Sequence, residues 1–377
     1  MAGMRRLLAL TCSVVFVDTV FYAALTPLVP YFTDNLGLSK SAVGVLSGAF
    51  GAGVLLGSAP GGYLAGRVGV RATAVGGLLL VAFTSFTFGL ADEAWQLVAL
   101  RLASGVGSAL GWVAALTWLS EQVPEGRRGE MIGMLLSAVV GTLLGPVLGG
   151  AAVAVGITLA FASVSLFAFT VAVWALLTSG PAPVPGKPFW EVLAATRRTQ
   201  ILTGLAFVAF SPLLFGALAV LAPLQLSQLG WGAAAIGAVF LVAALFEAVV
   251  HPLLGRWSDR SGHRTPVLAG ILVGSLAVLL ALPWAEYTPL VALLVVLAGI
   301  FFNAPLVPGT YLLSQEAEKA SIGGAPTFGA TNFAWASGYA VGTSMGGSLA
   351  DLGGDVLSYL SLAAVCLLAL LLLTRAA

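Results

Sequence analysis

Four side chains that can carry a charge lie inside long apolar stretches of the sequence. They are Asp18, Arg101, Glu247 and His251. An ionisable group at bilayer depth costs about 2.5–3.5 kcal/mol on insertion scales, so such groups are retained mainly where they bind or transfer a substrate, an ion or a proton. A carboxyl group withdrawn from water takes up a proton more readily, and histidine exchanges one near neutral pH. The four residues therefore predict proton uptake and release inside a membrane.

The positions of these residues along their helices indicate which of them meet. At about 1.5 Å per residue, Asp18 lies roughly 16 Å along a first helix, and Arg101 about 10 Å along a fourth helix that starts from the opposite side. The two side chains reach a similar depth and could form a pair. Glu247 and His251 stand four residues apart, so they share one helix face.

A purely structural role stays open for each of the four. Asp18 and Arg101 could anchor neighbouring helices through hydrogen bonds. His251 lies one turn from the membrane edge, where water could reach it. For Glu247 the structural and functional interpretations weigh equally.

Uncharged polar and aromatic residues in the same stretches are candidates for contact with a solute. They are Tyr22, Trp112, Gln225, Asn303, Tyr311, Asn332 and Trp335. Asn332 and Trp335 are three residues apart and can line one cavity. Aromatic walls suit flat or lipophilic solutes. Each residue, taken alone, is more often a packing residue than a ligand contact.

The composition places the whole chain in lipid. Of its 377 residues, 59% are hydrophobic and 8% are charged, whereas soluble domains carry roughly 25% charged residues. The net charge of +1 disfavours a nucleic-acid partner. Cys12 and Cys366 stand in apolar runs and are expected to be inert thiols. The sequence has no cluster typical of metal binding or catalysis, so we expect no enzyme activity, cofactor or metal.

The apolar runs fit an all-α membrane protein with twelve transmembrane helices. The expected spans are residues 7–32, 41–63, 72–91, 95–120, 131–154, 157–178, 200–227, 231–254, 265–284, 288–313, 326–349 and 356–374. Twelve spans put both termini on one side. Nearly all Lys and Arg residues fall on that side, and Lys40 lies opposite. The positive-inside rule therefore makes both termini cytoplasmic.

A proline-rich break at residues 179–199 divides the chain. We expect a six-helix bundle at 1–178, a cytoplasmic linker at 179–199 and a second six-helix bundle at 200–377. A ten-residue signature supports this division, because it occurs at Gly62–Arg71 and again 193 positions later at Gly255–Arg264. Duplicated halves are how many transporters build a site at their interface.

Glycines recur every four residues in three of the spans. The three sets are Gly53, Gly57 and Gly61; Gly141, Gly145 and Gly149; and Gly338, Gly342 and Gly346. Each set lies on one helix face and lets a neighbouring backbone approach closely. The faces serve either as plain tight packing or as sliding surfaces between the two halves.

These motifs resemble the major facilitator superfamily over the whole chain. Gly62–Arg71 is similar to the loop signature between the second and third helices of that family, and Gly255–Arg264 to its weaker echo. Arg101 followed by a Gly-rich stretch resembles the helix 4 motif, in which the arginine is implicated in proton transfer. Gly141–Gly150 matches the helix 5 motif of the antiporter branch, and the first helix, with Asp18, Pro27 and Pro30, resembles the twelve-helix drug–proton antiporters.

The resemblance implies a set of gating residues that control the change of conformation. They are Gly62, Arg67, Gly69 and Arg71; Gly255, Asp259, Arg260, Gly262 and Arg264; and Gly141, Gly145, Pro146 and Gly149. One departure matters, because Gly66 stands where the family has an acidic residue that holds the outward-facing closure. Asp259 keeps the acid in the second copy, so this lock would depend more on the second loop.

Together these observations predict a secondary active transporter that exports a small organic compound in exchange for protons. An uptake symporter or uniporter for a metabolite remains the alternative, because the same fold serves both. We expect a monomer in the cell membrane whose partners are the solute, protons and lipid. The excess of arginine over lysine suggests a bacterial source.

Overall fold

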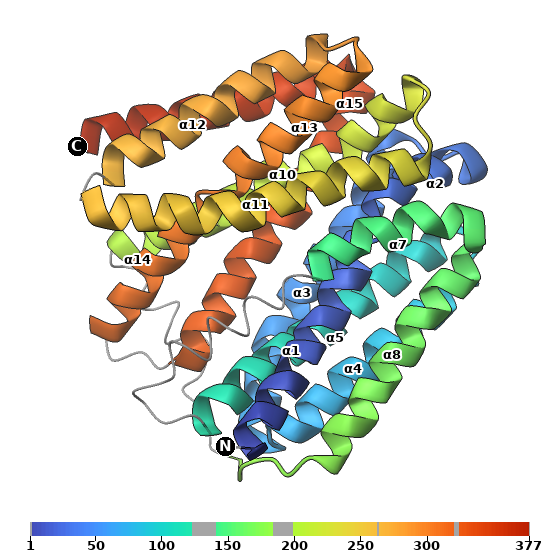
Figure 1. Cartoon of the computed structure of the whole chain (residues 1–377), viewed down its shortest axis with the longest axis vertical. Helices are drawn as coiled ribbons and strands as arrows, with labels where there is room; N and C mark the ends of the chain where they lie inside the picture. The colour runs from blue at the N-terminus through green and yellow to red at the C-terminus, as the bar shows by residue number, and fades with distance from the viewer. Residues whose placement is uncertain (1, 123–140, 184–198, 262–263, 320–323, 377) are drawn as a thin grey trace.

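The structure, a computed structural model, describes residues 2–122, 141–183, 199–261, 264–319 and 324–376. The described chain is helical and forms two groups of helices that meet at one end and diverge toward the other, as Figure 1 shows. Both chain termini lie at the diverging end, one at the tip of each group. The opposite end, where the groups meet, is called the outer side below, after the orientation predicted from the charge pattern.

The first group contains the helices before residue 178. Its elements are α1 (Ala2–Ala23), the 3-10 turn η1 (Thr26–Leu28), α2 (Val29–Leu36), α3 (Lys40–Arg67), α4 (Val70–Phe88), α5 (Ala94–Gln122), α7 (Gly141–Val155) and α8 (Ile157–Leu177). Short turns that contain glycine separate several of them. Gly37 and Gly69, for example, have φ angles of 62° and 94°, which a side chain would disfavour.

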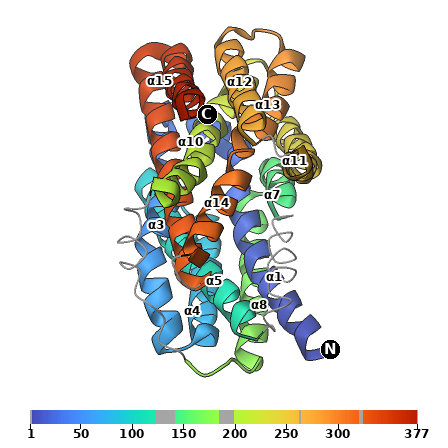
Figure 2. The ribbon, with the colours of Figure 1, turned by 90° about the vertical axis from the view of Figure 1, so that its left-hand side faces the viewer.

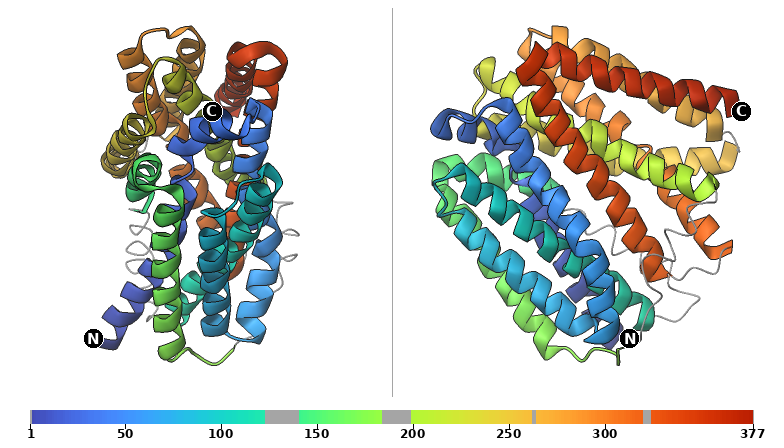
Figure 3. Two further views of the ribbon diagram at one scale, coloured as in Figure 1. Left: turned by 90° about the vertical axis from the view of Figure 1, so that its right-hand side faces the viewer. Right: turned by 180° about the vertical axis from the view of Figure 1, so that it is seen from behind.

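The second group contains the helices after residue 199. Its elements are α10 (Thr199–Gln228), α11 (Ala233–Ser261), α12 (Arg264–Ala281), the turn η4 (Leu282–Trp284), α13 (Thr288–Asn303), α14 (Leu306–Lys319) and α15 (Gly324–Ala376). The backbone of α15 is not helical at Gly353 and Gly354, so α15 comprises two helices joined at a kink. Figures 2 and 3 show the two groups from the sides and from behind.

Every predicted span corresponds to a helix in the described residues. Ten segments are long and apolar enough to cross a membrane, and one of them, Thr327–Leu373, contains the kink of α15 and so provides two crossings. The shorter apolar helix Gly141–Val155 belongs to the span predicted at 131–154, whose first ten residues lie outside the described ranges. An all-helical membrane fold is thus confirmed.

Two of the predicted spans are interrupted rather than continuous. The first helix breaks after Ala23 into η1, which contains Pro27. The tenth breaks between Asn303 and Leu306, where Pro305 has no N–H to continue the hydrogen-bond ladder. Tyr22 and Asn303 therefore stand beside breaks in their helices. Interrupted helices of this kind commonly form solute sites in transporters.

The glycine faces pack within each group and not between the groups. A methyl group added to Gly57 would lie 2.9 Å from Ala109 Cβ, and one added to Gly145 would lie 2.5 Å from Ala23 Cβ. The third set meets α10, where a methyl group on Gly346 would lie 2.7 Å from Ala217 Cβ. The interpretation of these three sets as sliding surfaces was therefore wrong, because each set turns toward a helix of its own half.

Other glycines form the contact between the two groups, in two seams. In the first seam α3 packs against α15, and in the second α11 packs against α7. A methyl group on Gly44 would lie 3.3 Å from Gly347 Cα, and one on Gly237 would lie 3.3 Å from Gly150 Cα. Gly44 and Gly237 are 193 positions apart, as are the two copies of the loop signature. The internal repeat therefore appears in three dimensions as two matching seams.

Candidate functional site

Asp18 is buried in the first group and is hydrogen-bonded to a neutral donor. The indole Nε1–H of Trp112 in α5 donates to Asp18 Oδ2 at 2.7 Å, and the residue is 8% exposed. Ser108 and Trp112 line a small cavity beside the carboxylate, between α1, α4 and α5, with a volume of about 10 Å³. That volume suits a single water molecule. The carboxylate thus lies in a tight, buried site beside space for one water molecule.

Arg101 lies in the same half but forms no ion pair with Asp18. The residue is 1% exposed, and its Nη1 donates to the Phe21 carbonyl oxygen at 3.4 Å. The guanidinium carbon lies 5.3 Å from the ring centroid of Phe21 and 4.8 Å from that of Phe50. The Nε and Nη2 atoms of Arg101 are buried and have no hydrogen-bond partner among the described residues. Asp18 is near enough to interact with Arg101 electrostatically, so the predicted pair is present only as a charge interaction across a gap.

Four aromatic side chains join the two groups beside Arg101. The ring of Tyr22 lies 5.4 Å from Trp335, 5.1 Å from Tyr339 and 5.4 Å from Phe50, between centroids. Trp335 and Tyr339 stack on each other at 5.3 Å with an interplanar angle of 7°. Tyr22 and Phe50 belong to the first group, and Trp335 and Tyr339 to the second. We call these four residues the aromatic cluster.

Glu247 and His251 form a polar group in the second half together with Asn303. Asn303 Nδ2 donates to Glu247 Oε2 at 3.0 Å, and His251 Nδ1 lies 3.8 Å from Glu247 Oε1. His251 Nε2 lies 3.0 Å from the Ile300 carbonyl oxygen. Because a carbonyl only accepts, Nε2 carries a hydrogen and Nδ1 is the nitrogen that titrates. Glu247 also interacts electrostatically with Tyr22, which connects this group to the aromatic cluster.

The remaining solute-contact candidates lie apart from these groups. Gln225 Nε2 donates to the carbonyl oxygens of Leu282 and Ala285 at 3.0 and 3.1 Å, and so holds α10 to the turn η4. Tyr311 is 43% exposed on α14, where its hydroxyl accepts a hydrogen bond from Gln315. The Nδ2 of Asn332 on α15 is buried without a partner among the described residues. Of the three, only Asn332 has a free donor in the protein interior.

Sequence reasoning missed Tyr339 and the two phenylalanines at Arg101. Tyr339 follows Trp335 by four residues, so helix periodicity could have placed it on the same face. Phe21 and Phe50 carried no such signal, because phenylalanine is common in apolar helices. Trp112 was expected to contact the solute, and the structure gives it the further role of donor to Asp18.

The structure describes the first loop signature in part. Arg67 donates to the Tyr63 hydroxyl on its own helix and lies 5.3 Å from that ring. Gly69 precedes α4 with a positive φ that only glycine adopts easily, and Arg71 is the second residue of that helix. In the second copy, Gly262 and the side chains of Asp259, Arg260 and Arg264 lie outside the described residues.

Asp259 provides a test of the expected lock at the second loop. Because Gly66 replaces the acid of the first loop, Asp259→Asn should lower the transport rate severalfold if the lock has moved to the second copy. The rate in membrane vesicles is the measurement, and Glu286→Gln, an exposed acidic residue of the outer side, is the control. Transport at the wild-type rate would exclude the relocated lock.

In the helix 5 motif, two adjacent positions face different neighbours. A methyl group on Gly145 would meet α1, whereas the carbonyl oxygen of Pro146 lies where a methyl group added to Gly237 on α11 would stand. The motif thus has one face inside its own half and one at the second seam. The described residues contain no group of three or more His, Cys, Asp or Glu side chains arranged to hold a metal ion.

Comparisons with known proteins agree with this architecture. The family model described as Major Facilitator Superfamily matches residues 11–224 and again residues 204–376. The chain is 26% identical over 379 residues to the uncharacterized MFS-type transporter YcaD of Escherichia fergusonii, covering 95% of this chain and 92% of that protein. Over a shorter stretch of 142 residues, the chain is 32% identical to the MFS-type transporter ppzB of Metarhizium rileyi.

The ppzB match covers 36% of this chain and only 29% of that protein, so this chain spans less than a third of that relative. Among solved structures, the present chain resembles a bacterial homolog of the human lysosomal transporter Spinster in an inward-facing, occupied conformation. The TM-score is 0.76 at 15% sequence identity, over 98% of this chain and 96% of that one. This likeness concerns the fold alone. The chain belongs to the major facilitator superfamily, whose members are membrane transporters and not enzymes.

Proposed function

We propose that this chain is a proton-coupled antiporter that exports a small organic compound by alternating access. The observation that carries the proposal is the carboxylate of Asp18, which is buried, makes no ion pair among the described residues and accepts a hydrogen bond from the neutral indole of Trp112. A buried carboxylate that lacks a direct ion pair is costly when ionised, so protonation is a low-cost way to stabilise it.

The aromatic cluster supports a solute site next to the proton site. Tyr22 lies one helical turn after Asp18 on α1 and contacts Trp335 and Tyr339 of the other half. A change of charge at Asp18 can therefore act on the residues that hold the two halves together. Flat or lipophilic solutes are the class that such rings bind best.

Glu247 and His251 supply a second site for protons in the proposal. With Nε2 held by the Ile300 carbonyl oxygen, a proton taken up by His251 arrives at Nδ1, opposite the Glu247 carboxylate. The two residues can share that proton, and Asn303 keeps the carboxylate oriented. We propose that this pair biases the second half as Asp18 biases the first.

The direction of coupling is tested in proteoliposomes with an imposed pH gradient. A panel of compounds is first screened for thermal stabilisation of the purified protein, in the wild type and in Asp18→Asn. For a stabilising compound, an antiporter accumulates it when the lumen is acidic, because protons leaving down their gradient drive the compound in. A symporter accumulates it only when the outside is acidic, and a uniporter responds to neither gradient. The last two outcomes would support the alternative functions.

His251→Gln examines the second proton site. Glutamine can still donate an N–H toward the Ile300 carbonyl oxygen, but it cannot take up a proton. We expect transport to lose its dependence on pH near neutrality while the protein stays folded, because imidazole titrates in that range. The readout is the transport rate from about pH 5.5 to about pH 8.5, which covers the usual titration range of histidine. A pH profile identical to that of the wild type would remove His251 from the mechanism.

A further inference from the structure

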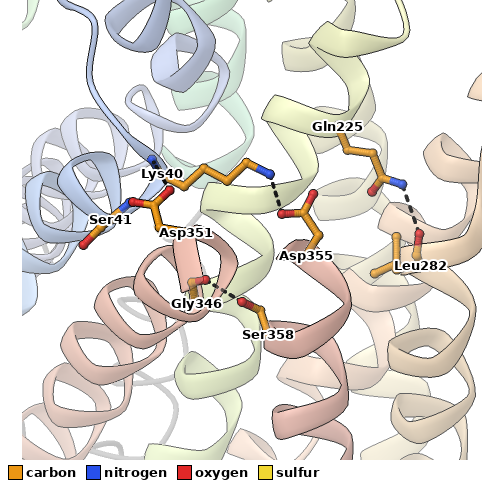
Figure 4. A network of polar contacts seen from close by, with 8 residues as sticks. All are labelled: Lys40, Ser41, Gln225, Leu282, Gly346, Asp351, Asp355 and Ser358. Atoms are coloured by element: carbon orange, nitrogen blue, oxygen red, sulfur yellow. Dashed lines mark hydrogen bonds and ion pairs between the residues drawn. The ribbon is translucent and has the colours of Figure 1, made fainter. Parts of the chain in front are cut away.

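The two seams between the halves differ in one respect, and that difference points to a latch. Both have the same close backbone approach, with the added methyl group of Gly44 or Gly237 at 3.3 Å from the opposite glycine Cα. The first seam also has a polar network on the outer side, shown in Figure 4. The second seam has alanines at the positions that match Lys40 and Asp351.

Asp351 of α15 caps the start of α3 from across the seam. Its Oδ1 accepts the backbone N–H of Lys40 at 3.2 Å, and its Oδ2 accepts that of Ser41 at 2.8 Å. The first four N–H groups of a helix have no partner within the helix. Ser39, the N-cap of α3, takes the next N–H, that of Ala42, at 3.2 Å. Three of the four donors at this helix start are therefore satisfied, two of them by the other half of the protein.

Lys40 and Asp355 add an ion pair to the same contact. Lys40 Nζ lies 2.5 Å from Asp355 Oδ1, and the two side chains are 24% and 22% exposed. This partial burial makes the pair less screened than an ordinary surface salt bridge. A further contact joins the Ser41 and Ser348 hydroxyls at 3.1 Å. Each of these bonds must break for α3 and α15 to separate on the outer side.

The second seam shows that close packing does not require these groups. Ala233 is 193 positions after Lys40, as Gly237 is after Gly44. Ala154 is four residues after Gly150, as Asp351 is four after Gly347. Alanines thus occupy the places of the lysine and the aspartate, yet the glycines approach equally closely. The polar network of the first seam is an addition to the packing.

We propose that Lys40, Asp351 and Asp355 form an outer latch that sets the resting conformation of this carrier. The first loop has Gly66 at the other end of α3, where the acid that would hold the opposite closure is absent. The helix pair α3 and α15 is therefore bonded at its outer end, and the carrier rests closed on the outer side. The residues of the latch position the halves and need not touch the solute.

The latch is tested by the distance between two spin labels on the outer side. Cysteines are introduced at the exposed positions Asp92 and Glu286, one in each half, after Cys12 and Cys366 are replaced by serine. Double electron–electron resonance should give one short distance in the wild type. A longer distance should appear in Asp351→Ala, which removes the helix cap, and in Lys40→Ala, which removes the ion pair. For Asp351→Ala the ratio of open to closed should rise about fivefold, as expected for the loss of a helix cap.

Two further variants make the outcome specific. Asp34→Ala removes an exposed acid of the same side at the end of α2 and should leave the distances unchanged. Each single reversal, Lys40→Asp or Asp355→Lys, should open the outer side, and the double reversal should close it again because the pair is restored. Closure by the double variant also shows that the two substitutions are compatible with a folded protein.

Unchanged distances in Asp351→Ala, Lys40→Ala and the single reversals would overturn the latch, and so would opening by Asp34→Ala. The measurement needs neither a solute nor a proton gradient. It can therefore fail while proton-driven export holds, and it can succeed in a carrier that proves to be a symporter.

Discussion

Asp18→Asn is expected to lower the rate of transport driven by a pH gradient by about 100-fold or more. A factor of about 100 is the lower end of the effect expected when a group that transfers a proton is lost. Asparagine retains an oxygen that can accept the hydrogen bond of Trp112 Nε1, now 2.7 Å from Oδ2. The fold should therefore survive, because the side chain is nearly the same size. The variant cannot take up a proton, so the carrier should still exchange the compound down its own gradient but lose its response to pH.

Trp112→Phe is the matched control for this prediction. Phenylalanine keeps an aromatic side chain in α5 but removes the donor that stabilises the ionised form of Asp18. Its pH profile should shift to favour the protonated carrier, while proton-driven transport persists. The measurement is the initial rate in proteoliposomes with and without a pH gradient. If Asp18→Asn transported as fast as the wild type under a gradient, the proton site would have to lie elsewhere.

Two glycine substitutions on α3 should have large effects on different properties, one on the stability of the first half and the other on the conformation of the carrier. In Gly53→Ala the new methyl group would run into the carbonyl oxygen of Leu102 on α5, inside the first half. Overpacking of this kind costs roughly 1–3 kcal/mol, so the melting temperature should fall. In Gly44→Ala the methyl group would lie 2.5 Å from the Thr343 carbonyl oxygen, on α15 of the other half. Under the alternating-access proposal, that contact is lost when the outer side opens.

Gly44→Ala should therefore leave the halves folded and shift the carrier toward the outward-open conformation. The measurements are the melting temperature of purified protein and the spin-label distance across the outer side. Gly76→Ala, in α4, is the control, because a methyl group there meets nothing within 4 Å. A lower melting temperature for Gly44→Ala than for Gly53→Ala would contradict the assignment of the two glycines to different interfaces.

The sequence determined the fold class because lipid imposes a simple rule. A segment that crosses a bilayer must satisfy its backbone internally and show an apolar surface, so helices can be read from runs of about 20 residues. The repeat at 193 positions predicted equivalent halves, and Gly44 and Gly237, which are 193 positions apart, lie at corresponding places in the two seams. Asp18 and Glu247 could be identified as candidate site residues from the sequence, because a charged side chain inside the bilayer is costly.

The direction in which each helix face points was decided only by the tertiary structure. The face of Gly53 turns to α5 and that of Gly44 to α15, although both stand on one helix and both have the same residue type. In a soluble protein the apolar face marks the inside, but in lipid both faces are apolar and this signal disappears. The same ambiguity concealed the contact between Asp18 and Trp112 and the cluster around Tyr22, which depend on helix rotation and on packing between distant segments.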